Sequence, residues 1–118
     1  VALAVLHHVP SFDLRVAALR DIHALLKPDS RLILSNWAFD RNERQRKRIV
    51  PWQSVGFDER ELEEGDALLV WKRGGAGYRY CHLITKEEMV RLAEASGFQV
   101  VKQYYADAKL NLYGVLKR

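Results

Sequence analysis

Apolar and polar residues along the chain follow periods that predict strands and helices in a regular order. Residues 1–6 are an unbroken apolar run ended by Pro10, a pattern typical of a strand covered on both faces. Apolar residues then recur at spacings of three and four, which predicts a helix with Ser11 as its N-cap and Pro28 as its stop; they are Leu14, Ala18, Ile22, Leu25 and Leu26. Residues 31–37 are rich in branched aliphatic side chains and predict a second buried strand, parallel to the first.

The last third of the chain predicts one helix and a hairpin. Thr85 and Glu88 have the spacing of a capping box, with Ile84 and Met89 placed as a hydrophobic staple, and Gly97 ends the helix. Residues 98–105 and 110–118 then predict two antiparallel strands joined by a short turn. The order strand, helix, strand, insertion, helix, strand, strand predicts an α/β fold.

Residues 40–83 have a different character and predict an insertion. Residues 41–48 carry five cations against one glutamate, and residues 58–66 carry six acids against one arginine. Gly74, Gly75 and Gly77 predict the loop of a hairpin between two short strands. The insertion therefore brings two blocks of opposite charge to a domain that is otherwise regular.

Composition narrows the class of protein. With 118 residues, 48% hydrophobic and 29% charged, the chain has the size of one small domain with a core. We expect neither a membrane span nor a secretory signal, and the single cysteine, Cys81, excludes an intrachain disulfide, so we predict a cytoplasmic protein. Because the first strand begins at Val1 with no lead-in, we expect an upstream half to be missing.

Two adjacent histidines end the first predicted strand. His7 and His8 lie where open α/β sheets bind ligands, at the carboxyl end of a strand. Successive strand side chains point to opposite faces, so we expect at most one of them to face a pocket squarely, with His8 ahead because it lies further into the loop. No third ligand is evident for a metal ion, and we predict none.

These segments together resemble a known family. Residues 4–39, which contain "AVLHHVPSFDLRVAAL", resemble the fourth strand, the following helix and the fifth strand of class I S-adenosylmethionine-dependent methyltransferases. "GDALLVWK", "GYRYCHLITKEEMVRL" and "LNLYGVLK" resemble the tRNA wobble-uridine carboxymethyl methyltransferases more narrowly, although the family usually has a tyrosine where this chain has Cys81. The chain has no glycine-rich turn that opens a helix after a strand.

The resemblance implies a fold, a cofactor and a reaction. The fold is the C-terminal part of a Rossmann-like methyltransferase domain over residues 1–118, with parallel strands, a C-terminal antiparallel hairpin, an insertion at about 40–83, and the cofactor-binding N-terminal half missing. The cofactor is S-adenosylmethionine, with Leu6, His7 and His8 beside it. The reaction is methylation of the carboxylate of a carboxymethyl group on wobble uridine of tRNA, and the need for a small helper subunit stays open. We expect residues 1–118 alone to bind the cofactor weakly or not at all.

Candidate substrate contacts follow from the same pattern. A carboxylate acceptor is already ionised near neutral pH and needs no strong general base, whereas an alcohol or phenol would need one, with His8 the leading candidate. Arg79 is the second candidate catalytic residue, because a guanidinium can orient a carboxylate or a phosphate. Side chains expected to contact RNA through charge, stacking or hydrogen bonds are Arg41, Arg44, Arg46, Lys47, Arg48, Tyr80, His82 and Asn111.

Two alternatives to a tRNA-modifying enzyme stay open. One is a class I methyltransferase that acts on a small metabolite, and the other is a non-catalytic module of the same fold that binds RNA or a protein partner. The cationic residues and the "YRYCH" segment favour tRNA over a small metabolite. An intact glycine-rich turn upstream would favour the enzyme, and a degenerate one would favour the binding module.

Overall fold

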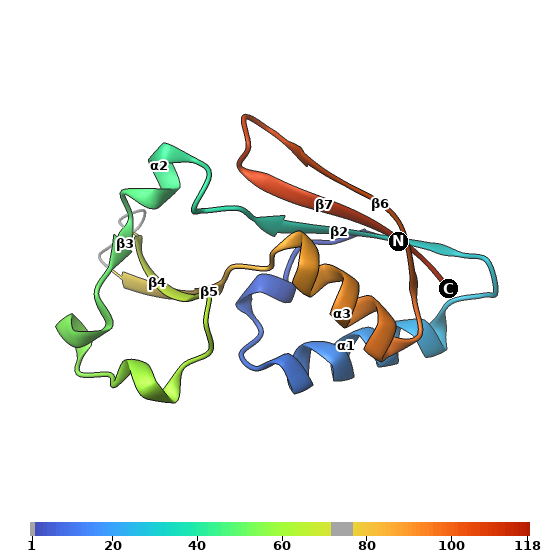
Figure 1. Ribbon diagram of the computed structural model, residues 1–118, viewed down its shortest axis with the longest axis horizontal. Coiled ribbons are helices and arrows are strands. Elements are labelled where there is room, and N and C mark those ends of the chain that lie inside the picture. The colour runs from blue at the N-terminus through green and yellow to red at the C-terminus, as the bar shows by residue number, and fades with distance from the viewer. Residues whose placement is uncertain (1, 72–76) are drawn as a thin grey trace.

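The strands form two separate sheets (Figure 1). The computed structural model describes residues 2–71 and 77–118. The first sheet has the order β1-β2-β7-β6 and the second has the order β3-β4-β5. Their bounds are β1 Ala2–Leu3, β2 Arg31–Trp37, β3 Ile49–Val50, β4 Asp66–Trp71, β5 Gly77–His82, β6 Gln99–Ala106 and β7 Asn111–Lys117; the helices are α1 Phe12–Leu25, α2 Glu43–Arg46 and α3 Lys86–Ser96.

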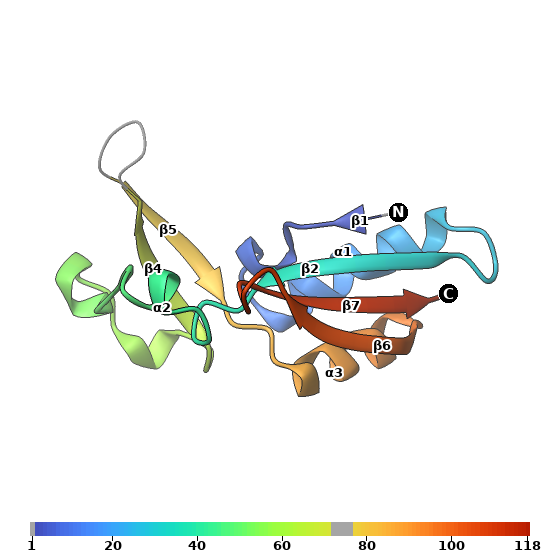
Figure 2. The ribbon, with the colours of Figure 1, turned by 90° about the horizontal axis from the view of Figure 1, so that it is seen from above.

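Strand directions in the first sheet agree with the predicted fold. β1 and β2 are parallel, and α1 connects them. β7 lies between β2 and β6 and is antiparallel to both, as Figure 2 shows from above. The predicted C-terminal hairpin is confirmed, and its last strand is reversed between two strands that run the same way.

Both long helices cover one face of the first sheet (Figure 1). Their contact with the strands forms the main core, whose buried members include Leu19, Leu32, Leu34, Met89, Leu92 and Leu116. The opposite face of β2 has no such cover among the described residues, and Ile33 is 40% exposed there. The predicted strand over residues 31–37 is confirmed, but it is buried on one face only, because its residues alternate between a covered and an open face.

Helix α1 begins where the sequence predicts, and its predicted apolar stripe is confirmed in part. The Ser11 side chain accepts a hydrogen bond from the Leu14 backbone N–H at 3.2 Å, which confirms it as the N-cap. Leu14 and Leu25, expected on the core face, are exposed, whereas Arg15 and Leu19 are fully buried. Ala18, Ile22 and Leu26 pack against the core as predicted, but the fully buried residues lie beside them and include an arginine.

Helix α3 is capped as predicted, with one exception. The Thr85 side chain accepts the Glu88 backbone N–H at 3.1 Å, and Gly97 ends the helix in the left-handed conformation with φ of 90°. Ile84 and Met89 are buried in the same core cluster. In a capping box the Glu88 carboxylate would accept a hydrogen bond from the backbone N–H of Thr85. Here it contacts His82 instead.

The first predicted strand is shorter than the apolar run suggests. β1 ends at Leu3, and Leu6–His8 form a 3-10 turn. The prediction of a strand over residues 1–6 is wrong beyond Leu3, so strand alternation does not decide which histidine is buried. Val1 lies outside the described residues.

The insertion forms the second sheet. β4 and β5 pair as an antiparallel hairpin, which confirms the predicted strand pair; the loop expected at the glycines falls mostly in residues 72–76, outside the described residues. One face of this hairpin carries Ala67, Leu69 and Cys81, which form a second small core with Phe39. In the described part of the chain, no helix is long and apolar enough to cross a bilayer.

Candidate functional site

Polar and aromatic side chains gather at the carboxyl ends of the two parallel strands. β1 leads into the turn that holds His7 and His8, and β2 ends with Asn36 and Trp37. The His7 and His8 ring centroids lie 4.9 and 5.0 Å from that of Trp37. Ligands bind at this edge of open α/β sheets, so this is the candidate site.

Two buried polar side chains at this edge have no hydrogen-bond partner among the described residues. Both ring nitrogens of His7 and both amide atoms of Asn36 are unpaired, although each side chain is only 1% exposed. Burial lowers the pKa of His7 to about 4; the charges of His8 and Arg79 act in the same direction, and the neighbouring Asn36 side chain opposes the shift. His7 is therefore neutral at physiological pH, and because its ring nitrogens have almost no accessible surface, a partner for them is a bound water or a ligand group that enters between the side chains around them.

His8 lies beside His7 but is held in a different way. Its Nδ1 is 3.0 Å from the Tyr80 backbone carbonyl oxygen. Because a carbonyl only accepts, Nδ1 carries a proton, so in the uncharged ring it is Nε2 that can accept. Nε2 therefore lies on the side of the ring that faces away from β5.

Arg79 and Cys81 project from β5 toward the same edge. The Arg79 guanidinium carbon lies 5.9 Å from the Trp37 ring centroid, and Cys81 Sγ lies 3.7 Å from His8 Nδ1. Burial raises the pKa of the Cys81 thiol to about 12, with the Arg79 charge opposing the shift only in part. Cys81 is therefore a protonated packing residue, whereas Arg79 is an exposed cation at the rim.

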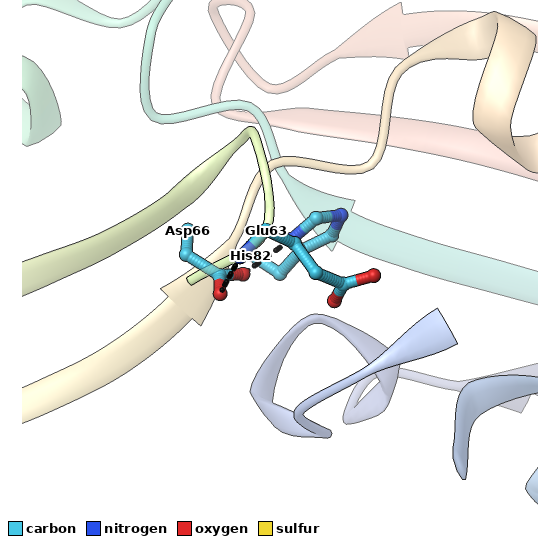
Figure 3. A group of neighbouring side chains, drawn as sticks. All are labelled: Glu63, Asp66 and His82. Carbon is cyan, nitrogen blue, oxygen red and sulfur yellow. Dashed lines mark hydrogen bonds and ion pairs between the residues drawn. The ribbon is translucent and has the colours of Figure 1, made fainter. Parts of the chain in front are cut away.

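The opposite face of β5 enters a buried ionic network, part of which Figure 3 shows. His82 Nδ1 is 2.6 Å from Asp66 Oδ1, and its Nε2 is 2.9 Å from the Glu88 carboxylate oxygens. Two carboxylate partners are satisfied only if both ring nitrogens carry protons. Burial alone would lower the pKa of His82, but the hydrogen bonds to Glu88 and Asp66 outweigh burial and raise it.

A second buried cation completes this network. Arg15 donates to the Glu63 carboxylate at 2.6 Å and to the Val9 carbonyl at 2.7 Å, with Glu88 4.0 Å away. Glu63 also accepts the Phe12 backbone N–H at 3.1 Å, where a carboxylate offsets the positive end of the helix dipole. The network thus joins the insertion to the first turns of both α1 and α3.

The network contains a group of side chains that could suit a metal ion. Ligand atoms of Glu63, Asp66 and His82 lie within 4.8 Å of one another. Each of these atoms already has a protein partner, because Arg15 neutralises Glu63, and His82 carries a proton toward Asp66. We therefore interpret the group as ion pairs.

The predicted RNA-contacting residues divide into three groups. Arg41, Arg44, Arg46 and Lys47 are exposed at and around α2, which follows the carboxyl end of β2. Arg48 is half-buried, and its carbonyl accepts the Val70 N–H. Tyr80 and His82 have inward partners, since the Tyr80 hydroxyl donates to Asp66 and His82 lies in the network, whereas the Asn111 amide donates to the exposed Asp107.

These inward partners correct the expected surface roles of Tyr80 and His82. His82 is 1% exposed and has both nitrogens occupied, so it does not present itself to a nucleic acid. Tyr80 is half-buried, and burial followed by its bond to Asp66 raises the pKa of its phenol. Asn111 pairs in register with Trp37 and so remains at the candidate edge.

Sequence reasoning missed Asn36, Arg15, Glu63, Asp66 and Glu88. Asn36 could have been found, because it follows Leu32 and Leu34 at a spacing of two on the covered face. Arg15 could have been found in the same way, four residues before Leu19. Glu63 and Asp66 carry no local signal, because Arg15 and His82 lie 48 and 16 residues away from them; the spacing of Glu88 indicated only a capping box.

Comparison with known proteins assigns the fold. A family model described as "Methyltransferase domain" matches residues 1–103. A search of curated proteins found no match. Among solved structures, a SAM-dependent methyltransferase from Methanosarcina mazei is 21% identical, with a TM-score of 0.67, over 99% of this chain and 57% of that protein.

A second solved structure is similar over the same range. It is the 1,6-didemethyltoxoflavin-N1-methyltransferase of Burkholderia thailandensis, 20% identical with a TM-score of 0.58, over 99% of this chain and 43% of that protein. At these identities the likeness shows a shared fold. The chain spans about half the length of these two proteins.

The network predicts a pH dependence of stability that depends on His82. Its pKa is raised in the folded state, so its stabilising contribution is complete below the unfolded value of 6.5 and is lost as pH rises through the folded value. We expect the free energy of unfolding of wild type to exceed that of His82→Asn by roughly 1 to 3 kcal/mol at pH 6.5, with a smaller difference at pH 9. Urea unfolding of both proteins at the two pH values measures it.

His23→Asn is the matched control, because His23 contacts the Phe98 ring outside the network. Its difference from wild type should not decrease between pH 6.5 and pH 9. A difference between wild type and His82→Asn that stays constant over this range would contradict an imidazolium at His82.

Proposed function

The chain belongs to the methyltransferase domain family, and on that premise we propose that it forms part of an S-adenosylmethionine-dependent methyltransferase that modifies tRNA. The observation that carries the proposal is the pair of buried, unpaired side chains, His7 and Asn36, at the carboxyl ends of adjacent parallel strands. Buried polar atoms are normally paired, so these atoms suit a ligand that binds at this edge.

The residues at this edge fit the proposed cofactor. S-adenosylmethionine supplies an electrophilic methyl group on a positively charged sulfur. His7 is neutral because its pKa is lowered to about 4, so it adds no charge repulsion beneath a positively charged cofactor. Leu6 packs in the core beneath, and His8 closes the wall toward β5.

The proposed acceptor is the carboxylate of a carboxymethyl group on wobble uridine. Such an acceptor needs orientation and exclusion of water, with no strong base. Arg79 is an exposed cation over Trp37 at the edge, where it suits the orientation of an acidic acceptor or of a neighbouring phosphate. Asn111, across from Trp37, is the further polar group at this edge.

The cationic residues around α2 support an RNA substrate. Arg41, Arg44, Arg46 and Lys47 are exposed just beyond the end of β2, outside the wall formed by His7 and His8. Several cations on one segment supply affinity for phosphates without sequence readout. Their place at the rim keeps them from the positively charged sulfur. In the same proposal the enzyme acts in the cytoplasm, with a helper subunit as a further partner.

Removal of three of these charges tests the RNA contact. In the intact protein, Arg44→Gln, Arg46→Gln and Lys47→Gln together should raise KM for hypomodified tRNA with little change in kcat. The slope of log affinity against log salt should fall by about 0.7 for each phosphate of a single-stranded loop that the variant no longer neutralises. Methyl-transfer kinetics and binding at several salt concentrations measure both.

The matched control removes exposed cations elsewhere, by Lys27→Gln, Arg91→Gln and Lys102→Gln. This variant should keep the wild-type KM and salt slope. An equal loss in both variants, or methylation of small acids with no transfer to tRNA, would contradict a tRNA substrate and favour a small-metabolite enzyme.

Substitutions at His8 test two expectations. The first is that its ring forms part of the wall of the site, and the second is that methyl transfer needs no general base. In His8→Asn the amide can still donate to the Tyr80 carbonyl, but the acceptor nitrogen is lost. We expect kcat of His8→Asn to stay within about tenfold of wild type, because general-base catalysis would be worth about a hundredfold or more. His8→Ala also loses the wall and should lower kcat/KM further, measured by methyl transfer.

Either of two results would contradict this assignment. Unchanged turnover of His8→Ala would exclude His8 from the site. A loss of a hundredfold or more in His8→Asn, with the variant still folded, would show that the acceptor needs a base and is not a carboxylate.

A further inference from the structure

The acidic block of the insertion has no role in the proposed methyl transfer, yet it borders a cavity of about 500 Å³. The cavity lies over one face of the β4–β5 hairpin, between the start of α1 and the segment that follows β3. This volume falls within the usual range of small-molecule sites, which is about 300 to 1,000 Å³.

Aromatic rings form much of the cavity wall. Trp52 lies 5.7 Å from Phe57, edge to face, and 6.5 Å from Tyr80, measured between ring centroids. Tyr78 adds a fourth ring. Phe57 and Tyr78 are 53% and 60% exposed, so two large apolar rings stand open to solvent at the cavity. Aromatic faces arranged in this way bind organic cations through the ring quadrupole.

The charges around the cavity have one sign. Its charged lining is Glu61, Glu63 and Asp66, and no described cationic side chain lines it. Arg15 forms an ion pair with Glu63, and His82 forms one with Asp66. Glu61 is exposed, and Glu64 lines the adjoining hollow. The phenol of Tyr80 adds no charge, since burial and its bond to Asp66 raise its pKa further above physiological pH.

The cavity and the candidate methyl-transfer edge lie on opposite faces of β5. Tyr78, Tyr80 and His82 alternate with Arg79 and Cys81, which face Trp37 and His8. An acidic cavity repels phosphates, so it is not a cradle for RNA. A cation bound there is also separated from the methyl-transfer edge by the hairpin itself.

We propose that this cavity binds a small organic cation, an alkylated ammonium compound, with its apolar groups against Trp52, Tyr78 and Tyr80 and its charge balanced by Glu61. The site is distinct from the cofactor edge, and its occupancy does not require methyl transfer. Charge complementarity selects the cation, and the volume of about 500 Å³ suits a free small molecule.

Choline and its uncharged carbon analogue, 3,3-dimethylbutan-1-ol, test this proposal on the intact protein. The two compounds have the same shape and differ in charge. Choline should bind saturably and about tenfold more tightly than the alcohol, because cation–π contacts are worth up to about 2 kcal/mol. Titration followed by the NMR signal of the Trp52 indole N–H, which points to the Asp66 carbonyl, locates the binding.

Two pairs of variants complete the test. Trp52→Ala should abolish choline binding, while Tyr104→Ala, at an exposed aromatic of β6, should leave it unchanged. Glu61→Gln should weaken choline binding several-fold, and Glu94→Gln on α3 should not; these surface changes do not threaten folding. Equal affinity for the two compounds, no saturable binding, or wild-type binding by Glu61→Gln and Trp52→Ala would overturn the proposal.

Discussion

The buried guanidinium of Arg15 is the constraint on which the arrangement of the two sheets depends. Burial of a charge costs several kcal/mol unless partners satisfy it, so Arg15 stays inside only where Val9, Glu63 and Glu88 surround it. Glu63 belongs to the insertion and Glu88 to the first turn of α3. An arginine at a core position of α1 therefore requires the second sheet to lie at one end of the first.

This constraint gives β5 two chemically different faces. On one side Arg79 and Cys81 approach the histidines and Trp37 at the end of the parallel strands. On the other side Tyr80 and His82 contact Asp66, next to the acidic cavity. Cationic and acidic side chains are thereby separated by the thickness of one hairpin, so the two faces of β5 differ in charge.

The local structure of the first sheet could be predicted from the sequence, and the ionic network could not. Ser11, Thr85 and Gly97 act within one helical turn, so their capping roles follow from spacing alone. β1 fails the prediction because an apolar run does not distinguish a strand from a 3-10 turn that packs in the core. The predicted stripe of α1 is right at Ala18, Ile22 and Leu26 and wrong at Leu14 and Leu25, because apolar periodicity alone does not place an arginine in the core.

The candidate site likewise contains residues that could be predicted from the sequence and residue pairings that could not. His7, His8 and Arg79 were predicted from strand ends and family resemblance, and they do gather near Trp37. The partners of His82, by contrast, lie 16 residues before it and 6 residues after it in separate elements. Pairings of this kind are set by how the insertion folds back onto α1, which no local pattern encodes.

Native-state amide hydrogen exchange of the β4–β5 ladder in Arg15→Met tests most directly whether the ionic network holds the second sheet. Arg20→Met is the matched control, since Arg20 lies on the same helix and bonds the Ala95 carbonyl, away from the insertion. We predict that Arg15→Met lowers protection in the β4–β5 ladder at least about tenfold more than in the β2–β7 ladder, while Arg20→Met does not. Equal loss in both ladders, or none in β4–β5, would contradict the account.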